Sequence, residues 1–111
     1  MTGTEYQNLA MRTASISEEY RSDRLYHGSL GLASEAGEVC GLLQKRYQGH
    51  DFDYDHMKKE LGDCMWMIAE ICSACGFTMD DVMQANIDKL KARYPDGFKV
   101  ENSLNRAEDD I

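Results

Sequence analysis

Apolar side chains recur at helical spacing along most of the chain. The clearest pattern lies between residues 54 and 75, where they return every three or four positions, as expected for one face of a helix. Weaker patterns elsewhere give four predicted helices in all, over residues 3–20, 26–47, 54–75 and 79–93. Gly76 and Pro95 follow the last two and are natural helix stops. No run alternates in the way of a strand, so the pattern predicts an all-α fold.

The second and third predicted helices each carry a pair of acids within apolar sequence. Glu35 and Glu38 lie in "ASEAGEVCGLLQK", and Glu60 and Asp63 lie in "KKELGDCMWMIAE". Residues three apart share one helical face. The pairings Glu35–Asp63 and Glu38–Glu60 both have their midpoint at Gly49, in the turn sequence "QGHDFDYD". An antiparallel hairpin turning at Gly49 therefore brings all four acids to one level.

Four carboxylates at one level need protons or a cation to neutralise them. Oxygen ligands without histidine suit a hard ion, so the pattern predicts a site for Mg²⁺, with Mn²⁺ as the alternative, rather than zinc. Two other interpretations stay open. The acids can be ordinary solvent-facing residues, or part of a di-iron bundle, although no histidine follows Glu38 or Glu60 by three residues as that class requires.

Composition narrows the choice of partners. The chain has 111 residues and a net charge of −8, which disfavours binding to a nucleic-acid polymer. It has no apolar run of the roughly 18 residues that a membrane span needs, and its first residues do not resemble a signal peptide. A cytoplasmic location is expected, where the four cysteines would be reduced and act as buried apolar residues. Cys72 and Cys75 form a C-x-x-C motif, for which a zinc or redox site is the alternative.

Three segments together resemble a known family. "EAGEVCGLLQK", "KKELGDCMWMIAEI" and "NIDKLKARYPDGF" are similar to the MazG-like nucleoside triphosphate pyrophosphohydrolases, over about residues 5 to 99. The resemblance implies a four-helix MazG-like bundle and hydrolysis of (deoxy)nucleoside triphosphates, including non-standard ones, to monophosphate and pyrophosphate. It also implies that Glu35, Glu38, Glu60 and Asp63 bind the metal. We select Glu38 as the acceptor of the proton from water.

Two alternatives to this activity remain open at this point. One is a relative specialised for one substrate, such as dCTP, dUTP or a diphosphate. The other is a catalytically silent helical module that binds a nucleotide or a protein.

Substrate contacts are expected outside the acidic quartet. The resemblance gives Asn86, Lys89 and Arg93, which share one helical face, a role in binding the phosphates. The alternative is a solvated face near a helix C-terminus, where basic residues are favoured by the helix dipole. Weaker candidates are Lys45 and Tyr94 for the phosphates, with Gln7 and Trp66 for the base.

The domain is expected to cover residues 1–100, followed by a polar, acidic and loosely held tail over residues 101–111. Four short helices with acids on an inner face leave little dry core. We therefore expect a second subunit to complete the nucleotide pocket, and the resemblance likewise implies a homodimer or a tetramer built from dimers.

Overall fold

The computed structural model describes all 111 residues, and every regular element in it is a helix. The five helices are α1 (Gly3–Met11), α2 (Arg21–Tyr47), α3 (Tyr54–Cys75), α4 (Met79–Arg93) and α5 (Val100–Leu104). The chain divides into two compact units, residues 1–79 and 80–111. No helix is both long enough and apolar enough to cross a bilayer. The predicted all-α fold is confirmed.

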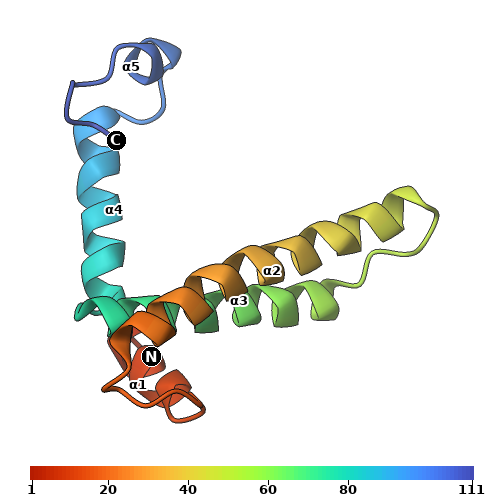
Figure 1. Cartoon of the computed structure of the whole chain (residues 1–111). Helices are drawn as coiled ribbons and strands as arrows, with labels where there is room; N and C mark the ends of the chain where they lie inside the picture. The colour runs from red at the N-terminus through yellow and green to blue at the C-terminus, as the bar shows by residue number, and fades with distance from the viewer. The chain divides into compact units, whose positions relative to one another are not determined.

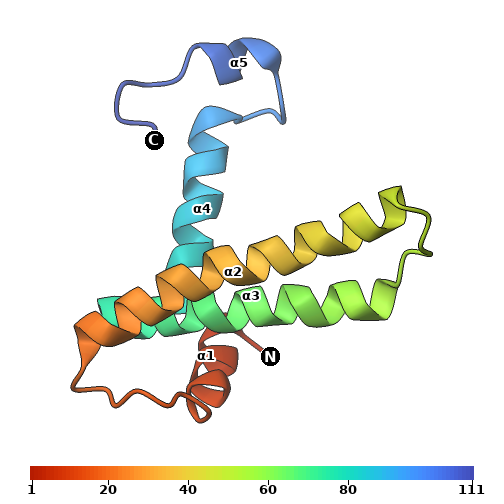
Figure 2. The same cartoon turned by 45° about the vertical axis from the view of Figure 1, so that its right-hand side comes forward.

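Helices α2 and α3 form the predicted antiparallel hairpin and lie side by side along their length (Figures 1 and 2). The chain turns at Gly49, whose φ of 103° places it in the left-handed region that glycine adopts without strain. Asp53 then caps α3 by accepting a hydrogen bond from the backbone N–H of His56. Gly76, with φ 82°, ends α3 as predicted.

Helix α1 packs against α3 at the end of the hairpin away from the turn (Figure 2). A capping box between Thr2 and Glu5 begins α1. The indole N–H of Trp66 donates to the carbonyl oxygen of Ala10 at 3.0 Å and to the hydroxyl of Thr13 at 2.9 Å. The small core of this unit is formed by Ala10, Ala69, Cys72 and Met79.

Two glycines of α2 let α3 approach closely. A Cβ on Gly28 would lie 2.9 Å from Cγ1 of Ile71 and 3.2 Å from the backbone oxygen of Met67. A Cβ on Gly31 would lie 2.5 Å from the sulfur of Met67. Because the neighbours of Gly28 include backbone, the absence of a side chain there sets the helix spacing at this end of the hairpin, whereas the Met67 side chain opposite Gly31 is flexible and can move.

Two predicted helix boundaries are wrong. Helix α1 ends at Met11 rather than near residue 20, because the hydroxyl-rich segment after it forms turns: Thr13 donates its hydroxyl proton to the carbonyl oxygen of Ala10. Helix α2 begins at Arg21 rather than Tyr26. Its first turn is fixed by tertiary packing, since Arg24 is buried, and local sequence carries no signal for that.

The cysteines are less buried than predicted. All four are free thiols, and only Cys72 is in the core. Cys40 and Cys75 are exposed, so the expectation that every cysteine is a buried apolar residue is wrong. Helical spacing places a residue on a face of its helix but does not reveal whether another element covers that face.

The second unit, residues 80–111, holds most of α4 together with α5. A turn around Pro95 separates the two helices, and Gly97 there has φ 88°. After α5 the chain returns to α4, where Arg93 donates to both carboxylate oxygens of Asp110 at 2.7 and 2.6 Å. The segment predicted as a loosely held extension thus contains a helix and an ion pair. The division into a domain over 1–100 and a tail stays a prediction.

Candidate metal centre

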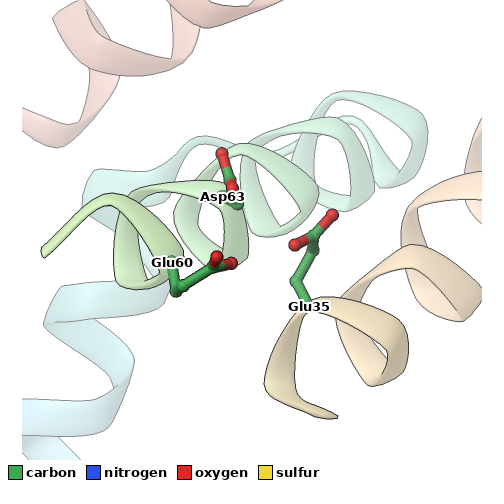
Figure 3. A group of neighbouring side chains, drawn as sticks. All are labelled: Glu35, Glu60 and Asp63. Atoms are coloured by element: carbon green, nitrogen blue, oxygen red, sulfur yellow. The ribbon is translucent and has the colours of Figure 1, made fainter. Parts of the chain in front are cut away.

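Three of the four predicted acids come together between the helices of the hairpin. Glu35 of α2 faces Glu60 and Asp63 of α3 (Figure 3), and one carboxylate oxygen from each lies within 4.8 Å of the others. Glu35 and Glu60 are half-buried, and Asp63 is exposed. The turn at Gly49 sets the helix register, and this register aligns the carboxylates.

The cluster is strongly electronegative. Burial raises the pKa of Glu35, and the neighbouring carboxylates of Asp63, Glu60 and Glu38 raise it further. Burial and the charges of Glu35, Asp63 and Glu60 likewise raise the pKa of the Cys64 thiol. Both raised pKa values mean that the surrounding negative charge disfavours a further negative charge and would favour a cation.

No lysine or arginine neutralises the cluster. Its one polar partner is His56, whose Nε2 lies 2.9 Å from an oxygen of Glu60 on the preceding turn. Three unpaired or weakly paired carboxylates from two helices form a donor set that suits a hard divalent cation. The residues present therefore fit a metal ion.

Glu38 lies at the edge of this arrangement. It is exposed and does not belong to the group of three, although its charge contributes to the raised pKa of Glu35. The structure thus brings Glu35, Glu60 and Asp63 together and leaves Glu38 beside them. The role of Glu38 as proton acceptor stays a prediction.

The two residues predicted for the base are engaged within the fold. Gln7 is buried; its amide nitrogen donates to the hydroxyl of Ser73 and the carbonyl of Phe77, and its oxygen accepts from the backbone N–H of Met79. Trp66 joins α1 to α3 through its indole N–H. Both arrangements are structural, and the roles in base recognition stay predictions.

The basic candidates lie in different settings. Lys45 is exposed in the last turn of α2, while Asn86 and Lys89 are exposed on α4. Arg93 forms an ion pair with Asp110, and its hydrogen bonds lower the pKa of the Asp110 carboxyl. The phenol of Tyr94 has a lowered pKa because of its hydrogen bond with Ser103 and the charge of Arg93.

Sequence reasoning missed two partners of candidate residues. The contact of His56 with Glu60 follows the i, i+4 spacing of neighbours on one helix face, and this signal was available. The pairing of Arg93 with Asp110 depends on the path of the chain after α5, for which the sequence offers no comparable signal.

Comparison with known proteins identifies the family. The model of the MazG nucleotide pyrophosphohydrolase domain matches residues 28–98, which include the hairpin acids and the basic face of α4. The Gene 37 protein of Mycobacterium phage L5 is 31% identical over 87 residues, covering 74% of this chain and 76% of that protein. No solved structure matches. The chain belongs to the MazG nucleotide pyrophosphohydrolase domain family.

Proposed function

We propose that the protein is a Mg²⁺-dependent pyrophosphohydrolase of (deoxy)nucleoside triphosphates that releases the monophosphate and pyrophosphate in the cytoplasm. The observation that carries the proposal is the convergence of Glu35, Glu60 and Asp63 from two helices, with no basic residue to neutralise them. Membership of the MazG family supports a reaction on nucleotide phosphates.

In this proposal Glu35, Glu60 and Asp63 hold Mg²⁺, with Mn²⁺ as the alternative. When bound, the ion would neutralise phosphate charge and promote ionisation of the attacking water. Glu38 accepts the proton of that water from its position at the edge of the cluster. His56 orients the carboxylate of Glu60 through their 2.9 Å contact.

We assign the phosphates of the substrate to Asn86, Lys89 and Arg93 on α4, with Lys45 and Tyr94 as further candidates. Phosphoryl and nucleotidyl transfer depend on positioning and charge stabilisation more than on covalent catalysis. Arg93 exchanges Asp110 for a phosphate oxygen when substrate binds.

The substitutions that test this assignment are Glu35→Gln and Glu38→Gln, which keep side-chain shape and remove one charge. Loss of a metal ligand at Glu35 should lower kcat/KM by about 100-fold or more and abolish Mg²⁺ binding. Glu38→Gln should lower kcat to a similar extent but leave Mg²⁺ binding largely intact, because Glu38 lies outside the group of three. Asp51→Asn, in the exposed turn, is the matched control and should retain full activity.

Retained turnover in Glu35→Gln would contradict the metal site. Retained turnover in Glu38→Gln alone would remove Glu38 from the proton transfer and leave the metal site standing. Calorimetric titration of each variant with Mg²⁺ separates the two results.

We also propose that the active form is a homodimer or a tetramer built from dimers. Beside the acids, α3 exposes 50% of Leu61 and 44% of Met65, one turn apart on the same face. Exposed apolar area of this kind is typical of an interface. Sedimentation should show a dimer or larger species that Leu61→Asp weakens, and a fully active monomer would contradict the proposal.

A further inference from the structure

A cavity lies in the first unit, at the end of the hairpin opposite the Gly49 turn. Its volume is about 690 Å³, and its walls come from α1, the segment after α1, the start of α2 and the end of α3. Its charged side chains are Arg12, Glu18, Arg21 and Arg24. Along α2, Arg24 precedes Glu35 by eleven residues, or about 16 Å of helix, so this cavity is separate from the metal centre.

The charge of this cavity is opposite to that of the protein. The chain has a net charge of −8, yet three arginines and a single carboxylate line the walls. None of the three arginines forms an ion pair within the protein, and that includes a pair with Glu18. The cavity therefore presents unneutralised positive charge.

Arg24 is the least solvated of the three. Only 4% of it is exposed, and its Nε has no hydrogen-bond partner. Its Nη2 lies 3.1 Å from the sulfur of Met11, which is a weak acceptor. A buried guanidinium without oxygen acceptors is costly, and an anion in the cavity would supply them.

The start of α2 adds to the positive potential. Tyr20 stands at the N-cap and makes no side-chain hydrogen bond to the first turn. A helix N-terminus carries partial positive charge and free backbone N–H groups. The guanidinium of Arg21 lies beside Gly76: a Cβ on Gly76 would be 3.6 Å from Nη2 of Arg21. Because Gly76 has no side chain, it does not cover the guanidinium.

We propose that this cavity binds a small phosphate-bearing anion through Arg12, Arg21 and Arg24. Arginine forks match phosphate oxygens in pairs, and three of them around one space suit a ligand with two phosphates or with one phosphate and further polar groups. Inorganic pyrophosphate and a nucleoside diphosphate share this chemistry. The aromatic ring of Phe77 in the wall would add a stacking surface for the base of the nucleotide.

The experiment is a calorimetric titration of the full chain, stripped of metal with a chelating resin, with inorganic pyrophosphate and separately with ADP. Without metal the acidic cluster repels both probes, so any binding is independent of catalysis, and the arginine variants distinguish binding in this cavity from binding at the phosphate-binding candidates of α4. The double variant Arg12→Gln/Arg21→Gln replaces exposed side chains and should bind about tenfold more weakly or worse. Arg46→Gln, at the other end of α2, is the matched control and should bind as the unmodified protein does.

Glu18→Gln, which removes the one carboxylate of the cavity, should tighten binding several-fold. In the unmodified protein, stronger binding of ADP than of pyrophosphate would assign the site to a nucleotide. Stronger binding of pyrophosphate than of ADP would assign it to an inorganic ligand, and either result supports the proposal. Failure of both probes to bind, or equal weakening by Arg46→Gln and the double variant, would overturn it. If the protein binds these probes in the arginine cavity but does not hydrolyse nucleoside triphosphates, the result would contradict the proposed function and leave the anion site standing.

Discussion

The two halves of the α2–α3 hairpin are built differently. Next to α1 the helices are in close contact: Ala69 and Glu70 are fully buried, and Gly28 leaves no room for a side chain. Next to the turn the side chains are mostly exposed, and between residues 32 and 68 only Leu42 is buried. The packed half carries the stability of the unit, and the open half holds the carboxylates of the candidate site.

Each half has one contact between a histidine and a glutamate, and the two contacts differ in how deeply the glutamate is buried. In the packed half, Nδ1 of His27 lies 2.5 Å from an oxygen of the fully buried Glu70. In the open half, Nε2 of His56 lies 2.9 Å from an oxygen of Glu60. The two histidine side chains are about equally exposed, at 46% and 45%, and the pairs differ in the glutamate, of which 0% is exposed at Glu70 and 14% at Glu60. The first contact gives one oxygen of a fully buried carboxylate its partner, while the other oxygen of Glu70 has none, whereas the second contact can break and re-form as a ligand binds.

The largest contrast is expected from one substitution made in both halves. Gly28→Ala forces a Cβ against the backbone of Met67 and should destabilise the protein by about 1–3 kcal/mol. Gly37→Ala meets nothing within 4 Å and should stabilise α2 by about 0.5–1 kcal/mol. Urea denaturation measures both, and equal effects would show that the halves are packed alike.

The two histidines sharpen the comparison. His27→Ala leaves the buried carboxyl of Glu70 without its partner and should cost about 1–3 kcal/mol of unfolding free energy. His56→Ala removes an exposed contact within one helix and should cost less than about 0.5 kcal/mol. A cost for His56→Ala as large as that for His27→Ala would contradict the assignment of stability to the packed half.

Metal binding should stabilise the open half in a pH-dependent way. The pKa of Glu35 is raised, so in the metal-free protein its ionisation is destabilising, and stability is lost as the pH rises through that pKa. Mg²⁺ binds the ionised form. At saturating Mg²⁺ the Tm should therefore rise by about 3 °C or more at about pH 7.5, and by much less at about pH 5.

Glu35→Gln is the control for this measurement and should remove the Mg²⁺ effect on Tm at both pH values, because Glu35 is a proposed metal ligand. An equal rise in Tm at both pH values would mean that the ion binds elsewhere.

The smallest effect is expected at a carboxylate that already has a cation. Asp110 is paired with Arg93, its pKa is lowered, and the pair should persist until the pH falls below the ordinary aspartate range. Asp110→Asn should free Arg93 and lower KM about threefold with kcat unchanged, whereas Lys89→Ala should raise KM. Unchanged KM in both variants, measured by steady-state kinetics, would remove α4 from the phosphate site.

Repetitive local patterns made the hairpin predictable. The shared midpoint of the acidic pairs at Gly49 set the register, and the structure brings Glu35, Glu60 and Asp63 together as that register requires. Glu38 has the correct spacing but lies outside the group, because spacing fixes height along a helix and not the distance across to its neighbour.

Features that depend on tertiary contacts were not predictable. Burial of Arg24 and Glu70, and the return of Asp110 to Arg93, join residues with no periodic relation. Gln7 looked like a polar residue free to read a base, but its amide is saturated by Ser73 and by backbone groups. Composition gives the number of charges and does not tell which of them meet.

The most direct test is to incubate the protein with a panel of ribo- and deoxynucleoside triphosphates, with and without Mg²⁺, and to separate the products by chromatography. The account predicts monophosphate and pyrophosphate, formed only when Mg²⁺ is present, and the panel also separates a broad enzyme from one specialised for dCTP or dUTP. Diphosphate and orthophosphate would contradict the proposed bond cleavage. No product from any nucleotide, with folded and metal-loaded protein, would contradict the proposed activity and favour a binding module.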